Sequence, residues 1–194
     1  MTQHRFVAAA LPALACTMLL GSCASDNTVP VVRAERAAAS PVAAGAADRL
    51  GVLARFTSCE DVAPAIAVYL HGLVPGPANK AGPDRVNCTW EVPAGAAGGT
   101  ATSSVEVVLE PGTGTVPSPS LAAGPGLVSI PDTAIEAAQG IAYSMSLMTA
   151  GTSVIATQIE LPDVSVSITG GGRDGQPPLD GPAAVAAAKR LLGL

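Results

Sequence analysis

The sequence predicts an α+β fold, a two-layer sandwich in which an antiparallel β-sheet is covered on one face by two or three helices. Five segments alternate apolar and polar residues with a period of two, which is typical of strands with one dry and one solvated face. Other segments carry helix start and stop signals. Gly- and Pro-rich stretches, of which 111–126 is the longest, separate the segments and have the composition of turns and loops.

The alternating segments are the expected strands. In each strand, every second residue, counted from the first, lies on the face that we expect the helices to cover. The residues between them lie on the solvated face. The residues expected on the covered face are Val86, Cys88, Trp90 and Val92; Val105, Val107 and Leu109; Ile141, Tyr143, Met145 and Leu147; Ile155, Thr157, Ile159 and Leu161; and Val164, Val166 and Ile168.

Three helices are expected. The first lies near 62–71, with Asp61 as its cap, Pro64 in its first turn and Gly72 as its stop. One face of this helix carries an apolar stripe formed by Val62, Ile66, Tyr69 and Leu73.

A second, short helix opens at Asp132 and ends at Gly140. The last covers 182–192, is capped by Asp180 and stops at Gly193. Its final turn holds Lys189 and Arg190, whose charges the helix dipole favours at that end.

Length and composition bound the functional classes. The chain has 194 residues, and we expect one folded domain over 49–194. Hydrophobic residues make up 48% and charged residues 13%, which excludes a disordered chain, whereas 3% aromatics predict a modest aliphatic core. The net charge is -5 and no basic cluster is present, so nucleic acid is not an expected partner.

The N-terminus has the pattern of an export signal over 1–22, with an apolar stretch too short for a comfortable membrane span. Leu20-Gly21-Ser22-Cys23 resembles the lipobox of bacterial lipoproteins. That resemblance implies diacylglycerol on Cys23, cleavage before it, and a domain anchored to the extracytoplasmic face of the cell membrane through a flexible Ala/Ser/Pro-rich tether, 23–48. The alternative is ordinary signal cleavage after Ala24.

Two cysteines remain in the domain once the signal and the acylated residue are set aside. An even pair in an exported domain favours a disulfide between Cys59 and Cys88. The rival interpretations are a metal pair or a reactive thiol. Metal sites need more ligands at close spacing, and His71 is the sole imidazole after position 22, so no metal is expected.

Cys59, a helix, His71-Gly72 and then Cys88-Thr89-Trp90 follow one another in this lipobox-bearing chain. This arrangement resembles the small lipoproteins of unknown function of mycobacteria and related actinobacteria, in which a Cys-led helix closed by Gly precedes a strand bearing Cys-x-Trp. The resemblance covers roughly 57–92 and implies a cell-envelope lipoprotein without a known activity. Many members of this type carry a further cysteine pair in the C-terminal half, which this chain lacks.

Groups for catalysis are scarce. His71 is expected at a helix end, a serine-hydrolase elbow is absent, and the glycine run 170–175 lacks the residues of a phosphate loop. A glycosidase pair could in principle come from Glu60, Asp61, Glu91, Glu106, Glu110 and Glu160, for which solvated positions are the simpler account. Trp90 is expected in the core beside the disulfide.

We therefore expect no enzyme activity and no cofactor. The favoured hypothesis is a non-catalytic, lipid-anchored binding module that meets another envelope protein through its sheet or loops. The alternative is a carrier of an apolar ligand, such as an envelope lipid, in a pocket between sheet and helices, which would need a cavity of some 300 to 1,000 Å3.

Overall fold

The computed structural model describes residues 51–96, 104–149, 152–172 and 175–194, all of which belong to one compact unit. The expected signal peptide 1–22, the lipidation site Cys23 and the tether 23–48 lie outside the described residues. Within the described ranges, no helix combines the length and the apolarity that crossing a membrane requires.

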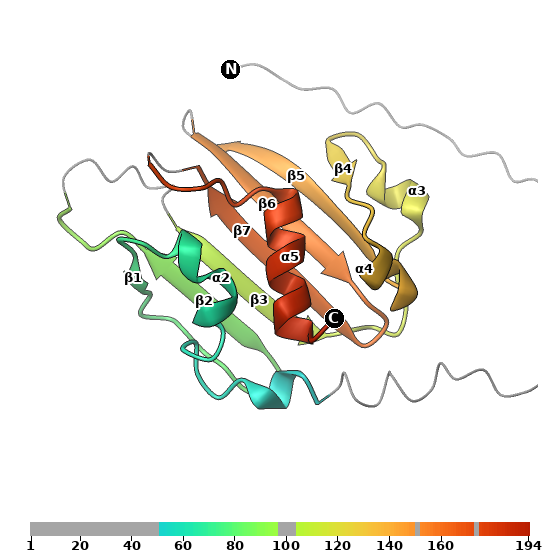
Figure 1. Cartoon of the computed structure of the whole chain (residues 1–194), viewed down its shortest axis with the longest axis horizontal. Helices are drawn as coiled ribbons and strands as arrows, with labels where there is room; N and C mark the ends of the chain where they lie inside the picture. Colours follow the sequence, from blue (N-terminus) through green and yellow to red (C-terminus); the bar gives the residue numbers. More distant parts are fainter. Residues whose placement is uncertain (1–50, 97–103, 150–151, 173–174) are drawn as a thin grey trace, which may run out of the picture. The chain divides into compact units, whose positions relative to one another are not determined.

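Seven strands form one sheet, and every neighbouring pair is antiparallel (Figure 1). Their order across the sheet is β1-β2-β3-β7-β6-β5-β4. The bounds are β1 Val74–Pro75, β2 Val86–Glu91, β3 Val105–Pro111, β4 Leu127–Ser129, β5 Ile141–Thr149, β6 Thr152–Glu160 and β7 Val164–Gly171. All five expected strands are confirmed, whereas the short edge strands β1 and β4 were not expected.

The helices cover one face of this sheet, which confirms the α+β sandwich (Figure 1). In Figure 1 the long helix α5 crosses in front of β6 and β7, and α2 lies beside it. The helical bounds are η1 Leu53–Arg55, α2 Ala63–Ile66, η2 Ala67–Tyr69, α3 Pro119–Ala122, α4 Thr133–Ala137 and α5 Gly181–Leu192, where η marks a turn of 3-10 helix.

The first expected helix differs from its prediction. It divides into α2 and the 3-10 turn η2, and Asp61 does not cap it. Instead, Asp61 Oδ2 accepts hydrogen bonds from the backbone N–H groups of Thr57 and Ser58 at 2.8 and 3.0 Å. These upstream donors hold the pKa of Asp61 below its ordinary value. The predicted apolar stripe is confirmed in part: Val62 and Ile66 are fully buried, whereas Tyr69 and Leu73 are only partly buried.

The other two helices begin as their caps predict. Asp132 Oδ1 accepts from the N–H groups of Ala134 and Ile135 at the start of α4, and Asp180 Oδ1 accepts from that of Ala183 in α5. Gly193 ends α5 in the left-handed conformation, at φ 73°.

The core lies between the helices and the inward side chains of β2, β3 and β7. Val107, Leu109, Val164 and Val166 have no exposed surface, and Ile168 is 1% exposed. The disulfide ties this layer together, because Cys59 precedes α2 and Cys88 lies at the centre of β2. The Cα atoms of the two cysteines are 5.5 Å apart.

Candidate functional site

In the part of the chain that the structure describes, one face of the sheet carries no helix, and the residues of β5 on that face differ from those predicted. We expected Ile141, Tyr143, Met145 and Leu147 to face the helices. In β5 it is Ala142 and Ser144 that are buried there, with exposed fractions of 3% and 9%. The apolar members of β5 therefore lie on the opposite, open face of the sheet.

A close approach between helix and sheet explains this reversal. A Cβ atom added to Gly181, the first residue of α5, would lie 2.5 Å from the side chain of Ile130 and 3.2 Å from Ser144 Oγ. The start of α5 is thus nearly in contact with the inward side of β5. Only small side chains fit between them at this point, so β5 has Ala142 and Ser144 inward and Tyr143 and Met145 outward.

Neighbouring strands extend the apolar surface of β5. The register places Leu127 of β4 and Ala156 of β6 on either side of Met145, and Val154 of β6 opposite Leu147. We call these residues the open-face patch: Leu127, Ile141, Tyr143, Met145, Leu147, Val154 and Ala156. Leu147 is 45% exposed and the others are partly exposed. The open side of an antiparallel sheet is ordinarily polar, so the patch is an exception that the core does not explain.

A polar region borders the patch towards the opposite edge of the sheet. The outward residues of β7 are Ser165, Ser167 and Thr169, and those of β3 include Glu106 and Glu110. Register places Glu160 of β6 and Glu110 of β3 on either side of Ser165. Apolar and acidic residues therefore lie on one continuous face.

The acidic groups on this face influence one another. Burial, together with the charge of Glu110, raises the pKa of Glu160, while a hydrogen bond with Ser165 acts in the opposite direction. Burial and the charge of Glu160 raise the pKa of Tyr143. Arg85 forms an ion pair with Glu110 at 2.9 Å, and both side chains are about half exposed.

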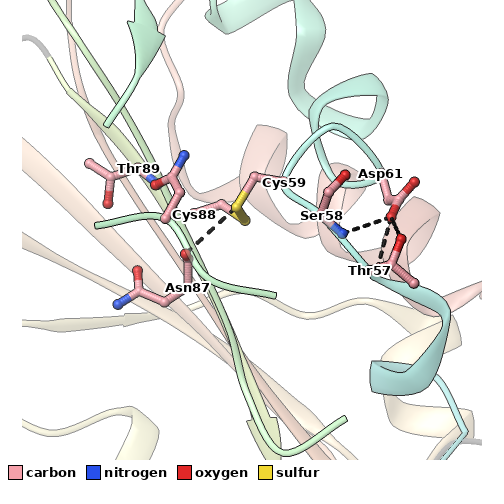
Figure 2. Close-up of a disulfide and its surroundings, with 8 residues drawn as sticks. Thr57, Ser58, Cys59, Asp61, Asn87, Cys88 and Thr89 are labelled. Carbon is pink, nitrogen blue, oxygen red and sulfur yellow. Dashed lines mark hydrogen bonds between the residues drawn. A yellow bond between two sulfur atoms is a disulfide. The ribbon is translucent and has the colours of Figure 1, made fainter. Parts of the chain in front are cut away.

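A concave region lies on the helix side, beside the disulfide between Cys59 and Cys88, whose formation is confirmed (Figure 2). The sulfur of Cys59 lies 3.6 Å from the carbonyl oxygen of Asn87, a packing contact because a bridged sulfur has no proton to donate. A half-open cavity of about 470 Å3 adjoins it, lined by Glu60, Lys80 and Trp90 among others. Trp90 is 4% exposed and packs in the core as expected.

A smaller cavity lies between α4 and the inward side of β5. Its volume is about 190 Å3, and Ile135 and Ala142 are among the residues that line it. This is below the range of roughly 300 to 1,000 Å3 that is usual for small-molecule pockets.

The acidic residues considered for a glycosidase pair are scattered. Glu60 and Asp61 lie before α2 on the helix side, while Glu91, Glu106, Glu110 and Glu160 lie on the open face. The described part of the chain contains no group of three or more His, Cys, Asp or Glu residues arranged to hold a metal ion. His71 is exposed and lies shortly after η2, directly before Gly72, whose φ is 74°. Its expected position at a helix end is therefore confirmed.

The sequence of β5 alone could not predict that its apolar residues lie on the open face. Its segment Ile-Ala-Tyr-Ser-Met-Ser-Leu alternates cleanly, and alternation is equally compatible with either orientation of the strand. The available signal is indirect: positions 142, 144 and 146 on the other face of β5 carry only Ala and Ser, residues small enough to lie beneath a helix.

Comparisons of this chain with protein-family models, with curated proteins and with solved structures found no significant match.

Proposed function

We propose that this protein is a cell-envelope lipoprotein, acylated at Cys23 and held at the extracytoplasmic face of the cell membrane. Its domain serves as a non-catalytic binding module for another envelope component. The lipobox and the short export signal support the anchor. The resemblance over 57–92 to actinobacterial lipoproteins supports the same location.

The single observation that carries the binding function is the open-face patch. Its residues are adjacent in register across β4, β5 and β6, on the face of the sheet that no helix of the described residues covers. Contiguous exposed apolar surface of this kind marks interaction sites in soluble domains. Burying it against a partner is favourable by roughly 25 cal/mol for each Å2 of apolar surface removed from water.

The cavities favour this module over a carrier of an apolar ligand. The apolar cavity between α4 and β5 is about 190 Å3, too small for an acyl chain with its headgroup. Two larger cavities have charged residues in their linings, which an apolar ligand would leave unpaired. The one beside the disulfide, of about 470 Å3, is lined in part by Glu60 and Lys80, and one of about 520 Å3 is lined in part by Arg55, Asp61 and Arg190.

Inhibition of signal peptidase II in expressing cells tests the anchor. We expect unprocessed precursor to accumulate, and mass spectrometry of the untreated protein to find an acylated N-terminal Cys23. A Cys23→Ala variant should accumulate as precursor without inhibitor. Normal processing of the wild type under inhibition, with an N-terminus at Ser25, would instead support ordinary cleavage after Ala24.

Site-specific photo-cross-linking in cells tests the binding surface. A photoreactive phenylalanine analogue placed at position 147 should give a discrete adduct with one envelope component, because Leu147 lies on the open-face patch. The matched control position is 68, because Val68 is a similarly exposed apolar residue, 55% exposed, on η2. Adducts that arise equally from both positions, or from neither, would contradict the proposed binding surface.

A further inference from the structure

Acidic residues beside the open-face patch indicate the charge of the partner that it binds; we call Glu106, Glu110 and Glu160 the acidic border. Glu106, Glu110 and Glu160 lie on the same face, on the β3 and β6 side of the patch. Arg85 forms an ion pair with Glu110, one of these three acidic residues. The surface therefore offers apolar contacts at one side and negative charge at the other.

The dimensions of the patch match a helix. Its three strands span two strand spacings, about 10 Å, which is close to the 10–12 Å diameter of a helix with its side chains. From Ile141 to Leu147 the strand rises about 20 Å, a length that about 14 helical residues cover. One helix laid along β5 would therefore cover the patch.

Glu160 lies on β6 itself, directly opposite Ile141 of the patch, whereas a polar strip separates the patch from Glu106 and Glu110 of β3. This strip consists of Ser165, Ser167 and Thr169, whose small side chains leave room above β7. Lys or Arg side chains on the helix could reach Glu160 at the end of the patch and extend across this strip to Glu106, with their aliphatic stems on the sheet.

Other occupants fit this surface less well. The edge strands are short, at two residues in β1 and three in β4, so they offer little backbone for an added strand. An anionic lipid surface would be repelled by the acidic border. A second copy of the chain docked through this same face would bring its own Glu106, Glu110 and Glu160, so that like charges would meet.

We propose that the open-face patch receives an amphipathic helix of a partner protein, with its apolar stripe over β5 and a Lys- or Arg-rich flank towards the acidic border. This inference rests on the binding function proposed above and adds the chemistry of the partner.

Binding of synthetic helices to the full processed lipoprotein tests the proposal. The protein is placed in phosphatidylcholine nanodiscs, with empty discs as the blank. The probe is an 18-residue Leu/Lys peptide with Leu at helical spacing, and its controls are a Leu/Glu peptide of the same pattern and a scrambled Leu/Lys peptide. Fluorescence anisotropy should give a Kd for the Leu/Lys helix about tenfold or more below that of either control.

Matched variants locate the binding. Glu106→Lys should weaken binding of the Leu/Lys helix about fivefold, while Glu136→Lys, on exposed α4 away from this face, should change it less than about twofold. Leu147→Asp should weaken it about tenfold, and Val68→Asp should leave it unchanged. Circular dichroism melting curves that match the wild type establish that each variant is folded.

Several results would overturn the proposal. Equal effects of Glu106→Lys and Glu136→Lys on the Kd would mean that the Leu/Lys helix is attracted by the net charge of the protein and not by the acidic residues of this face. Equal affinity for the Leu/Glu and Leu/Lys helices would mean that the acidic residues do not select the partner. Sedimentation that reveals a dimer abolished by Leu147→Asp would assign the patch to a second copy. Vesicle binding abolished by the same variant would assign it to lipid.

The cross-linking experiment separates failure of this inference from failure of the proposed function. If position 147 cross-links a component in cells while the Leu/Lys helix does not bind, the patch is a binding surface for another chemistry and the helix proposal is wrong. If position 147 gives no adduct either, the binding function itself is contradicted.

Discussion

β7 and β5 are alternating strands of the same antiparallel sheet, but they present their apolar residues to opposite sides. In β7, Val166 and Ile168 lie against the helices and are at most 1% exposed. In β5, Ala142 and Ser144 occupy that side, whereas Leu147 is 45% exposed on the other. The difference teaches that alternation identifies a strand without identifying which of its faces is buried.

The cause is the helix layer above each strand. α5 approaches β5 so closely at Gly181 that Ser144 has no room for a larger side chain. Over β7 the separation accommodates branched residues, and the ordinary inward arrangement results. The patch on β5 is therefore free of any role in the core, which is what makes it available for binding.

Introducing the same charge into both strands should give the largest contrast. Val166→Asp should lower the free energy of unfolding by about 4 kcal/mol, because it buries an unpaired carboxylate. Leu147→Asp should lower it by less than about 1 kcal/mol, because the new charge remains in solvent. Urea unfolding of the full chain, followed by circular dichroism, measures both. Equal losses would mean that β5 is oriented as the sequence analysis expected.

Removing the disulfide should cause the next largest loss in the free energy of unfolding, and it should weaken mainly the β2 side of the sheet. The double variant Cys59→Ala/Cys88→Ala opens a loop between residues 29 apart in sequence, and should lose about 3.6 kcal/mol by loop entropy. Hydrogen exchange should show a greater loss of protection in β2 than in β5. The opposite order would contradict the placement of the brace.

A smaller effect is expected where α5 is joined to the start of α4 above β5. Lys189 Nζ lies 2.9 Å from Asp132 Oδ2, and this hydrogen bond is the leading cause of the lowered pKa of Asp132. Lys189→Met should cost about 1 kcal/mol at neutral pH and raise the pKa of Asp132. Arg85→Met, which removes the exposed pair with Glu110, is the control and should cost less.

The pH dependence of the Lys189→Met effect follows from the sign of the shift. A carboxyl group whose pKa is lower in the folded state stabilises the fold above its ordinary pKa of about 3.9, and this contribution disappears as the pH falls through the folded value. The stabilities of wild type and Lys189→Met should therefore converge in acid. NMR titration of Asp132 and unfolding at two pH values test this, and a gap that persists at low pH would contradict it.

Replacing Glu160 on the open face should change the free energy of unfolding least. Unlike the variants above, this replacement should stabilise the protein. Because the pKa of Glu160 is raised, folding is disfavoured by its ionisation, and this penalty grows as the pH rises through the folded pKa. Glu160→Gln should stabilise the protein by about 0.5 kcal/mol at most at neutral pH, since solvent screens the partly exposed group. The gain should vanish below the ordinary Glu pKa, with Glu106→Gln as the control on the same face. A loss of stability at neutral pH would contradict the assigned cause.

The elements with local signals could be predicted from the sequence. Asp132 and Asp180 cap their helices, the five strands lie where alternation placed them, and Cys59 pairs with Cys88. Each of these depends on neighbouring residues or on a pair without competitors. The cap at Asp61 failed because two upstream N–H groups compete for its carboxylate, which residue spacing alone does not reveal.

The sequence by itself determined the antiparallel sheet with its helices and the pairing of Cys59 with Cys88, because strand period and helix caps are local properties and the domain offers a single cysteine pair. Only the tertiary structure decided the order of the strands, the edge strands β1 and β4, and the outward orientation of β5. That orientation depends on how closely a helix some forty residues away approaches the sheet, as the crowding between Gly181 and Ser144 reveals. The candidate binding surface is a consequence of this packing.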